Sequence, residues 1–431
     1  MSVAATAAPK KLLVVTATQG FRHSSIPLAE KVLAGLGEET GLFTVDYARG
    51  GADGKGSADL NEKLSPDSLK NYDGVIFANT TGDLPLPDRD AFIAWVKSGK
   101  AFIGTHSASD TFHGYPLYIE MLGGEFLTHH AQAGVECINM DRNSPATRNL
   151  GAKYSVFDEI YLLKNFHRDQ VHGLLTLDKH PNTGIPGDYP IAWCKQFGEG
   201  KVFYTSLGHR EDVWLSDSYQ KHLLGGIEWA LGIQRGQAEP QNTKARLSKA
   251  EFDDGFKILF DGTDLNGWKL RHADGTNSWS VQNGMLVNVP EPHGNDLVSE
   301  ENFRDFVVRY DYMVPTNSNS GLYLRGRYEI QILEDSQRKK PDVGGNGAIY
   351  HVAAPTEFVT RPSGQWQTAQ ATIKGNKISL ILNGVKVHDN FEVTQATGGA
   401  LDSNLDQAGP IMLQGDHGAI AFRNIRIKAL E

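Results

Sequence analysis

The sequence predicts two unlike domains, an α/β domain with a mostly parallel sheet followed by an all-β sandwich. Its 431 residues are enough for two or three domains. Up to residue 232, continuous apolar strands alternate with helices, which is the pattern of a parallel sheet covered on both faces. From residue 251, short strands are joined by turn signals and several show strict two-residue alternation, which indicates a β-sandwich or jelly roll.

The first domain begins with a buried strand, KLLVVTA, at residues 11–17. A helix is expected next at SSIPLAEKVLAGLGEE, with Ser24 or Ser25 as its cap and Pro27 in its first turn. The later strands and helices are predicted, in chain order, at LFTVDYA, YDGVIFAN, DRDAFIAWVKSG, AFIGT, IYLLKNF, HGLLTLD, a strand pair turned by GEG, and SYQKHLLGGIEWALG.

A linker is predicted at residues 233–250, IQRGQAEPQNTKARLSKA, because this stretch has no large apolar cluster. It separates an α/β domain at 10–232 from a β-sandwich domain at 251–431. The strands of the second domain are expected within WSVQNGMLVNV, DFVVRYDYMVP, SGLYLRGRYEIQILED, TAQATIKGNKISLILNGVKVHD and GPIMLQGDHGAIAFRNIRIKAL.

The composition excludes several classes of partner. The net charge of −9 disfavours nucleic acid and anionic membranes, since both attract basic surfaces. No apolar run reaches the roughly 18 residues of a membrane span. The two cysteines, Cys137 and Cys194, are far apart and show no metal spacing. The sequence gives no information on the oligomeric state.

The first eleven residues, MSVAATAAPKK, resemble the end of a secretory signal near its cleavage site. They are rich in small residues but have neither a basic n-region nor an apolar h-region. As the remnant of a trimmed export signal they predict a periplasmic or secreted protein. As a flexible leader they are compatible with a cytoplasmic one.

Histidines follow the predicted strands of the first domain. In an open parallel sheet, ligands bind outside the carboxyl ends of the strands, so several of these imidazoles face the expected site. They are His23, His106, His129, His130, His167 and His209. Neutral imidazole binds metals and also serves as a general acid or base, and no compact metal motif decides between the two roles.

The motifs TATQGFRHSSIP, GTHSASD, FDEIY, YPIAW and GEGKVFYTSLGH resemble the trehalose-utilisation ThuA-like family over residues 10–232. The resemblance implies a flavodoxin-like, doubly wound fold related to class I glutamine amidotransferases. Those enzymes have a G-x-C-x-G turn and a later His-x-Glu, and His209 and Glu211 occupy a comparable place here. His106 stands where the thiol is required, so glutaminase activity is not expected.

We therefore expect His23, His106 and His209 to share a pocket. They are candidate ligands of a divalent metal such as Zn²⁺, and His106 and His209 are also candidate catalytic acid–base groups. Candidates of lower rank are His130, Glu159 and His167. Ser107 is an alternative nucleophile at the same turn, and Asp110 is expected to cap the helix that follows.

In the second domain, GLYLRGRYEIQIL at 321–333 reads as one alternating strand. Even positions are apolar and are expected to face the core. The odd positions place Tyr323, Arg325, Glu329 and Gln331 on the other face, which is either solvated or suited to a sugar. Further substrate-binding candidates lie in neighbouring segments, at Tyr350 and Gln414.

The second domain resembles the 3-keto-disaccharide hydrolase family, a concanavalin-like jelly roll, over about residues 254–431. The motifs are ILFDGTDLNGW, SGLYLRGRYEIQILED, NGAIYH, QWQTAQATIKGNKISLILNGV and GPIMLQGDHGAIAFRNIRIK. The resemblance implies cleavage of glycosides oxidised to a ketone at C3, by loss of the C2 proton and elimination at C1. Glu329, His351 and His417 are candidate acid–base residues, with Arg325 or a metal as enolate stabiliser.

Together the two resemblances predict an enzyme of carbohydrate catabolism that acts on 3-keto-glycosides. The β-domain is expected to cleave the bond, and the first domain to process a keto-sugar. Two alternatives remain at this point. The β-domain is a non-catalytic carbohydrate-binding module attached to a ThuA-like enzyme, or both domains only bind glycans.

Overall fold

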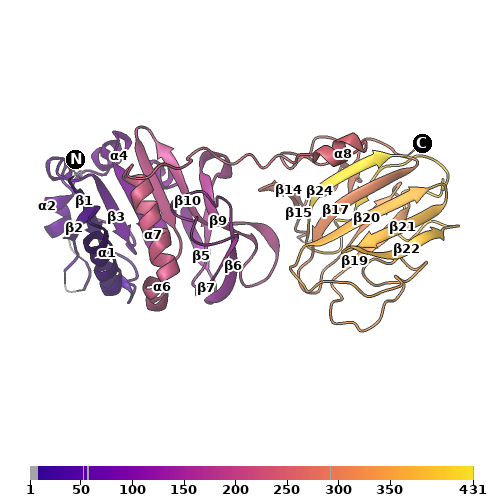
Figure 1. Ribbon diagram of the computed structural model, residues 1–431, viewed down its shortest axis with the longest axis horizontal. Helices are drawn as coiled ribbons and strands as arrows, with labels where there is room; N and C mark the ends of the chain where they lie inside the picture. The colour runs from indigo at the N-terminus through magenta and orange to yellow at the C-terminus, as the bar shows by residue number, and fades with distance from the viewer. Residues whose placement is uncertain (1–7, 52, 56–57, 292, 431) are drawn as a thin grey trace, which may run out of the picture. The chain divides into compact units, whose positions relative to one another are not determined.

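The computed structural model describes residues 8–51, 53–55, 58–291 and 293–430 (Figure 1). The chain divides into two compact units. One contains the chain up to Leu177 and Tyr189–Gln241, and the other contains Asp178–Asp188 and the chain from Asn242 onward. Most of the signal-like leader lies in residues 1–7, outside the described residues. No described helix has the length and apolar character needed to cross a membrane.

The N-terminal unit is built on a nine-stranded sheet in the order β2-β1-β3-β4-β11-β10-β9-β6-β7. The pairs β1–β2, β1–β3, β3–β4 and β4–β11 are parallel, and β10–β11 and β6–β7 are antiparallel hairpins. The strands are β1 Lys10–Val15, β2 Phe43–Ala48, β3 Gly74–Ala78, β4 Ala101–Thr105, β6 Ala133–Asn139, β7 Lys153–Asp158, β9 His172–Lys179, β10 Pro186–Phe197 and β11 Gly200–Thr205; a separate ribbon pairs β5 Glu125–His129 with β8 Tyr161–Lys164.

Helices cover both faces of this sheet, as Figure 1 shows. Alternate residues of one strand enter different cores: Leu12 and Val14 pack with α1 and α7, while Leu13 and Val15 pack with α4 and α5. The continuous apolar strands of the sequence are therefore explained by burial on two sides. The helices are α1 Ile26–Thr40, α2 Ala58–Lys63, α3 Pro66–Leu69, α4 Arg89–Lys97, α5 Pro116–Leu122, α6 Glu211–Leu215 and α7 Asp217–Ala230, with short 3-10 turns η1 His106–Asp110 and η2 Arg168–Gln170.

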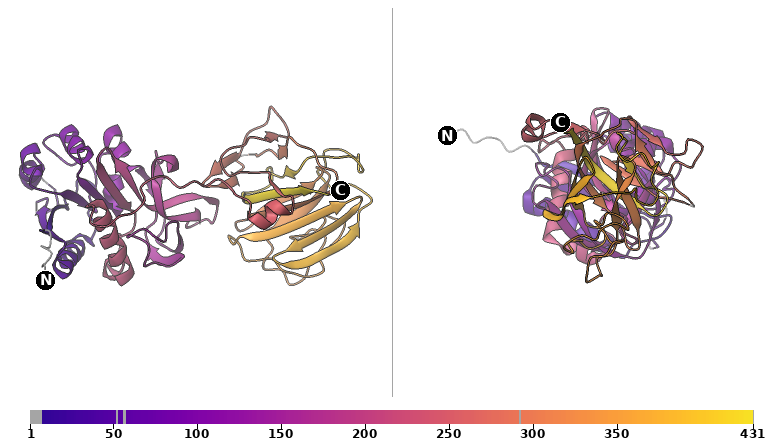
Figure 2. Two further views of the ribbon diagram at one scale, coloured as in Figure 1. Left: turned by 45° about the horizontal axis from the view of Figure 1, so that its top comes forward. Right: turned by 90° about the vertical axis from the view of Figure 1, so that its right-hand side faces the viewer.

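The C-terminal unit consists of two packed sheets, shown from two further directions in Figure 2. The larger has the order β14-β15-β24-β17-β20-β21-β22, with β12 beside β24, and the smaller has the order β13-β16-β23-β18-β19. The strands are β12 Lys257–Ile258, β13 Trp268–Leu270, β14 Trp279–Gln282, β15 Met285–Asn288, β16 Leu297–Ser299, β17 Phe306–Met313, β18 Asn319–Leu324, β19 Tyr328–Leu333, β20 Gln367–Lys374, β21 Lys377–Leu382, β22 Val385–Glu392, β23 Met412–Leu413 and β24 Ile420–Ala429; α8 Lys249–Asp253 precedes them.

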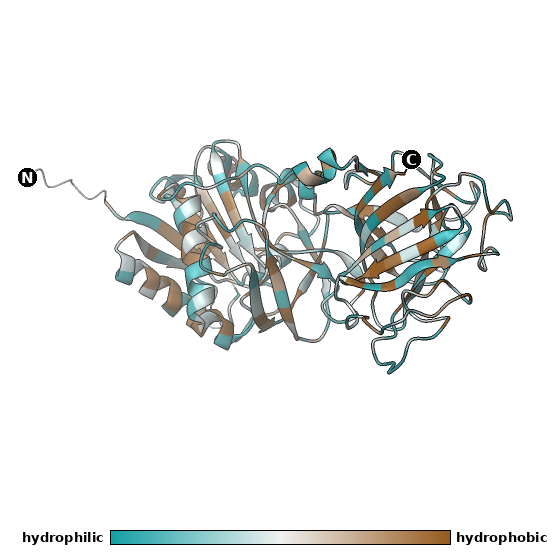
Figure 3. Ribbon diagram, turned by 45° about the vertical axis from the view of Figure 1, so that its right-hand side comes forward, coloured by the Kyte–Doolittle hydropathy of each residue, from teal (hydrophilic) through white to brown (hydrophobic). Residues whose placement is uncertain are grey.

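One apolar core lies between the two sheets. Leu322 and Ile330 of the smaller sheet and Ala371 and Phe422 of the larger are among its buried residues. Figure 3 shows hydrophobic (brown) and hydrophilic (teal) residues succeeding one another along these strands. The predicted combination of a mixed α/β part and a β-rich sandwich is therefore confirmed, and the finer names flavodoxin-like and jelly roll stay predictions.

The expectation of a single strand at 321–333 is wrong. This segment is a hairpin: β18 turns at residues 325–327 and returns as β19, with Tyr323 opposite Glu329. Arg325 begins the turn in a left-handed conformation, with φ of 55°. Partners in this antiparallel pair have the same parity, so the even-numbered residues still face the core as predicted.

Candidate functional site

The turn after β4 presents a histidine in an unusual backbone conformation. His106 has a φ of 42°, in the left-handed region that residues with a side chain rarely adopt, and it is fully buried. The Tyr204 hydroxyl donates to the His106 carbonyl oxygen at 2.7 Å, and Nδ1 of His106 contacts the Ser206 carbonyl oxygen at 2.8 Å. Neighbouring groups thus hold a strained turn that aims the ring in one direction.

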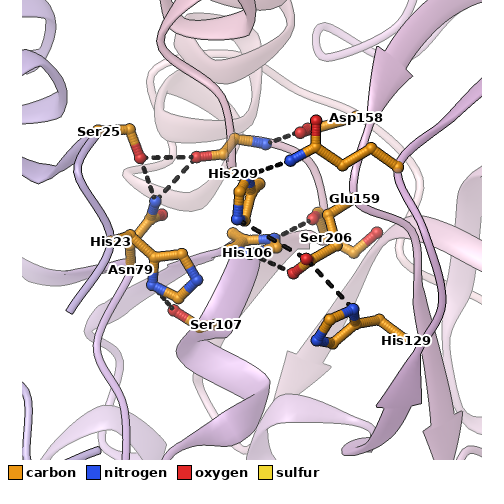
Figure 4. A network of polar contacts seen from close by, with 12 residues as sticks. His23, Ser25, Asn79, His106, Ser107, His129, Asp158, Glu159, Ser206 and His209 are labelled. Atoms are coloured by element: carbon orange, nitrogen blue, oxygen red, sulfur yellow. Dashed lines mark hydrogen bonds and ion pairs between the residues drawn. The ribbon is translucent and has the colours of Figure 1, made fainter. Parts of the chain in front are cut away.

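Four side chains meet at the carboxyl edge of the parallel strands (Figure 4). His23 follows β1, His106 follows β4, Glu159 follows β7 and His209 follows β11. One donor atom from each lies within 4.8 Å of all the others. Glu159 oxygens lie 3.6 Å from His106 Nε2 and 3.7 Å from His209 Nε2. This histidine cluster borders a cavity of about 350 Å³.

The donors of the histidine cluster suit a divalent metal. Because the Ser206 carbonyl can only accept, Nδ1 of His106 must carry the proton, which leaves a lone pair on Nε2. Among the residues that the structure describes, that buried Nε2 has no hydrogen-bond partner, as expected for a ligand atom. Ligand atoms around a tetrahedral Zn²⁺ lie about 3.4 Å apart, so the two carboxylate contacts are close to that spacing. The cluster could therefore hold a metal.

His209 is the member whose tautomer must be considered. Its Nδ1 lies 3.2 Å from Nε2 of Gln132, while Oε1 of Gln132 accepts from Arg210 at 2.8 Å. An amide nitrogen facing Nδ1 leaves the ring proton on Nε2, toward Glu159. Coordination through Nε2 would require the Gln132 amide to turn over.

Burial and neighbouring groups shift the pKa values of three members of the histidine cluster, His23, Glu159 and His209. Burial lowers the pKa of His23 to about 2, with help from the neighbouring imidazoles His106, His209 and His129. Burial and His106 also lower the pKa of His209, although Glu159 opposes them. For Glu159, burial alone would raise the pKa, but the nearby imidazoles of His106, His209 and His129 outweigh it and lower the pKa. The neutral imidazoles of His23 and His209, beside the carboxylate of Glu159, are ready to bind a metal at neutral pH.

A polar network fixes the loop that carries His209. The carbonyl of Gly208 accepts from Asn79 Nδ2 and Trp214 Nε1, each at 2.8 Å, and from Ser25 Oγ at 3.3 Å. Its N–H donates to Asp158 at 2.7 Å. Ser25 is the N-cap residue of α1, but its hydroxyl is used here instead of capping the helix. These bonds hold His209 toward the cluster.

The structure brings together His23, His106, Glu159 and His209 and leaves other candidates outside. His130 and His167 are exposed and do not belong to the cluster. Glu211 accepts from Ser24, so Glu159 supplies the carboxylate of the cluster. Two residues that line the cavity were not ranked as pocket residues from the sequence: His129 was only one of the strand-end histidines, and Asp110 was expected to be a helix cap.

Ser107 lies beside the histidine cluster. Its hydroxyl is 3.3 Å from Nδ1 of His23, and both residues are buried. The two cysteines are buried elsewhere, and burial raises the pKa of Cys137 to about 12. No thiolate is therefore available at the turn after β4, in agreement with the sequence.

The C-terminal unit contains a second candidate site on the outer face of its smaller sheet. Tyr323 and Glu329 face each other across β18 and β19, and the tyrosine hydroxyl lies 2.8 Å from a carboxyl oxygen of Glu329. Burial raises the pKa of Glu329 to about 7, although the hydrogen bond from Tyr323 and the charge of His417 oppose the shift. Glu329 is thus a carboxyl group that can change between its protonated and deprotonated forms near neutral pH.

Glycines make room for this tyrosine–glutamate pair. A Cβ on Gly321 would lie 2.4 Å from Oε1 of Glu329, and one on Gly399 would lie 2.5 Å from the Tyr323 hydroxyl. On the same face, Gln331 and Gln414 have buried side-chain oxygens with no hydrogen-bond partner among the described residues. Unpaired amide oxygens are costly when buried, and they are the acceptors a sugar hydroxyl would satisfy.

Tyr350, His351 and His417, the remaining predicted residues of this site, differ in their contacts and in their exposure. The N–H of Tyr350 donates to the carbonyl of Glu329 at 3.1 Å, so its segment runs directly beside the glutamate. His351 is exposed, with its ring 4.2 Å from that of Tyr350. His417 is half-exposed and paired with Asp416, and its charge acts on Glu329.

Arg325 does not belong to the site, in contrast to the prediction. Its side chain is 1% exposed and is bound within the fold. The guanidinium donates to Asp305 at 2.8 Å and to the carbonyl oxygens of Gly375 at 2.9 Å and Leu405 at 3.1 Å. With these donors occupied, Arg325 stabilises the hairpin turn and cannot stabilise an enolate on the outer face.

Comparison with known proteins finds a different family in each part of the chain. The model of the ThuA family, described as trehalose utilisation, matches residues 11–230. The model of the 3-keto-alpha-glucoside-1,2-lyase-like domain matches residues 255–428. A Bacteroides thetaiotaomicron protein named 3-keto-disaccharide hydrolase is 22% identical over 41% of this chain and 79% of its own length.

Two solved structures illustrate the likeness of each part. A Parabacteroides merdae protein, provisionally described as ThuA-like, is 20% identical with a TM-score of 0.44, covering 54% of this chain and 98% of its own. A Parabacteroides distasonis protein, provisionally described as a glycosyl hydrolase, is 22% identical with a TM-score of 0.39, covering 44% and 100%. By the family matches, the chain belongs to the ThuA family and continues into a 3-keto-alpha-glucoside-1,2-lyase-like domain.

Proposed function

We propose that the chain is a carbohydrate-active enzyme that acts on 3-keto-glycosides, and that its C-terminal domain breaks the glycosidic bond. The observation that carries this proposal is the buried Glu329 carboxyl, with its pKa near 7 and a tyrosine hydroxyl against it. A general base works best when its pKa lies near the operating pH. The matching domain family and the name of the Bacteroides relative support the choice of substrate.

The reaction follows from the acidity that a C3 ketone gives to the C2 hydrogen. Glu329 takes the C2 proton, the electron pair moves toward the C3 oxygen, and the hydroxyl of Tyr323 is placed beside the base. The C1–O bond then breaks, and the leaving oxygen takes a proton, for which His417 and His351 are the candidates. Addition of water to the resulting double bond completes a net hydrolysis. Gln331 and Gln414 are placed to bind hydroxyls of the substrate.

The test is turnover of a panel of 3-keto-glycosides and their unoxidised parents by the full chain. We expect cleavage of the keto compounds only, and its loss in Glu329→Gln with sugar binding retained. Glu301→Gln is the matched control, because Glu301 is an exposed carboxylate paired with Lys257. Cleavage of the unoxidised parents alone would defeat the proposal. Full activity in Glu329→Gln would remove Glu329 as the base.

We further propose that the N-terminal domain processes a keto-sugar with a divalent ion, such as Zn²⁺, held by the histidine cluster. His23, His106 and Glu159 have the donor atoms and protonation for this, and His209 joins them once Gln132 turns. Such an ion polarises a carbonyl oxygen and so makes the neighbouring carbon more acidic. The side chains of the cavity would then bind and orient the sugar.

Metal content of the purified chain tests this second proposal. We expect about one equivalent in the wild type and in His167→Ala, whose histidine is exposed, and a loss in His106→Ala. Absence of stoichiometric metal, together with unchanged keto-sugar turnover in chelator, would overturn it.

The alternative of a non-catalytic sugar-binding β-domain predicts a different result in the same panel. Sugar binding would be present, and neither Glu329→Gln nor His351→Ala would change the turnover of keto-glycosides.

A periplasmic or secreted location is part of the proposal, and fractionation of cells that express the full-length gene tests it.

A further inference from the structure

The N-terminal cavity has a second acidic wall that the histidine cluster does not use. Asp110 lines the cavity together with the aromatic residues Phe21, Phe126 and Tyr161. It ends the 3-10 turn that begins at His106, so one short segment carries both a member of the histidine cluster and a residue of the cavity wall.

Asp110 is one end of a chain of charged groups. Nε2 of His113 contacts the Asp110 carboxylate, and Nδ1 of His113 lies 2.9 Å from a Glu125 oxygen. Each ring nitrogen faces an acceptor, so the ring is held in its doubly protonated form. Burial opposes this charge, but the two carboxylates outweigh it and raise the pKa of His113.

Glu125 is the fixed end of this chain. It is 2% exposed, and it is bound by the N–H of Gly114 at 3.0 Å, by Asn165 at 2.9 Å and by Lys164 at 3.3 Å. These partners keep Glu125 ionised, so His113 is held and in turn holds Asp110. The charged groups that face His113 are therefore Asp110 and Glu125, with Lys164 behind Glu125.

The fold does not need the Asp110 carboxylate to hold its own loop. The main chain does this already, because the carbonyl of Asp110 accepts from Gly82 and the N–H of Phe112 donates back to Gly82. The expected role of Asp110 as a helix cap is not what the structure shows, since its carboxylate binds His113. It is 24% exposed at the cavity.

The other walls indicate what enters the cavity. Phe21 is 67% exposed, an unusual state for phenylalanine, and its ring contacts that of His23 at 4.9 Å. Aromatic rings at the walls and carboxylates and imidazoles between them suit a small polyol ring with apolar C–H faces. A cavity of about 350 Å³ is of the size that small-molecule ligands occupy.

We propose that Asp110 moves a proton on and off the carbon beside the ketone of a keto-sugar in this cavity, and that His113 and Glu125 position Asp110 for this step. The inference rests on the proposed action of the N-terminal domain on keto-sugars. Asp110 takes the proton, the C–H electron pair becomes the carbon–carbon double bond of an enediol, and the carbonyl oxygen receives the charge. Return of a proton from Asp110 to the same face of that carbon restores the ketone with its proton exchanged. Return to the former carbonyl carbon, with the hydroxyl proton of the enediol passing to the other oxygen, moves the ketone by one carbon. No other reactant is consumed.

The test is hydrogen–deuterium exchange of 3-keto-D-glucose in D₂O, followed by NMR. The full chain is used with Glu329→Gln in the background, so that the C-terminal base cannot contribute. We expect exchange faster than without protein, a fall of about 10²- to 10⁴-fold in Asp110→Asn, and partial recovery in Asp110→Glu. Asp217→Asn is the control, because Asp217 is an exposed carboxylate on α7.

Two further measurements keep the inference separate from the proposals it rests on. Metal content is expected to be unchanged in Asp110→Asn, and cleavage of keto-glycosides is expected to persist when Glu329 is intact. His113→Gln should lower kcat for exchange and leave KM unchanged, because His113 acts through Asp110. Metal-loaded protein without catalysed exchange, or undiminished exchange in Asp110→Asn, would overturn the inference while the metal and the cleavage activity stand.

Discussion

The two candidate sites are assembled in opposite ways. The histidine cluster draws its four members from loops that follow four different strands, between residues 23 and 209. The tyrosine–glutamate pair comes from one hairpin, and its two residues are six positions apart in the chain. A site on a hairpin depends on local register, whereas a site at a sheet edge depends on the whole domain. Mutations should therefore act differently on the two.

The largest expected effect is that keto-glycoside cleavage and metal binding can be lost separately, each through a variant of one site. Glu329→Gln should reduce keto-glycoside cleavage by about 10²- to 10⁴-fold and leave metal content unchanged. His106→Ala should weaken metal binding and leave cleavage unchanged. The loss of affinity should exceed the roughly 100-fold that is typical when a residue that only hydrogen-bonds to a metal ligand is replaced. Cleavage rates and metal titrations on both variants check this. Parallel loss of both properties in either variant would contradict two independent sites.

The next effect tests the space that the hairpin reserves for its glutamate. In Gly321→Ala the new Cβ would lie 2.4 Å from Glu329 Oε1 and would displace the carboxylate. We expect cleavage to fall by about 10- to 100-fold, since a shift of about 1 Å in a catalytic group has that cost. Sugar affinity and kcat are to be measured together. Gly344→Ala, where a Cβ meets only a flexible side-chain oxygen at 3.5 Å, is the control.

The pH dependence of cleavage gives a smaller but more specific effect. A base must be deprotonated, and the pKa of Glu329 is about 7, so kcat/KM should rise with pH through that value. The Tyr323 hydrogen bond lowers this pKa, so Tyr323→Phe should move the rise to higher pH. Rates from pH 5 to 9 in both proteins check the direction. A rise that moves to lower pH would show that Tyr323 does not stabilise the carboxylate.

The smallest effect is expected at the turn after β4. Ser107 lies 3.3 Å from His23, but no carboxylate contact to that ring is present among the described residues. Without such an orienting group, a serine nucleophile lacks the third member of a catalytic triad. Ser107→Ala should therefore keep keto-sugar processing within about twofold of wild type. A loss approaching that of His106→Ala would favour the nucleophile interpretation instead.

The sequence was a good guide where periodicity or chain order is sufficient. The apolar strands before residue 232 and the alternating strands after residue 251 predicted the two kinds of sheet. The positions of His23, His106 and His209 after strands predicted that they share an edge, because carboxyl ends of parallel strands converge. The even-numbered core residues of the hairpin followed from the same reasoning.

Other features depended on contacts that periodicity does not encode. Arg325 was placed on the binding face by its parity, but a turn at that residue buries its guanidinium among carbonyl oxygens. His129, and not His130, lines the cavity, in a strand whose pairing with β8 shifts register between Phe126 and Thr128. Asp110 belongs to a chain with His113 and Glu125 only because β5 returns beside the 3-10 turn.

The sequence by itself determined the two domain types, the absence of a thiol at the turn after β4 and the histidines available to replace it. These depend on residue identity and on short-range periodicity. Only the tertiary structure decided that Glu159 joins the imidazoles, that Tyr323 lies against Glu329 and that Arg325 is unavailable. The physical reason is that hydrogen bonding and desolvation depend on what long-range packing places within a few ångströms, and spacing along the chain does not fix those neighbours.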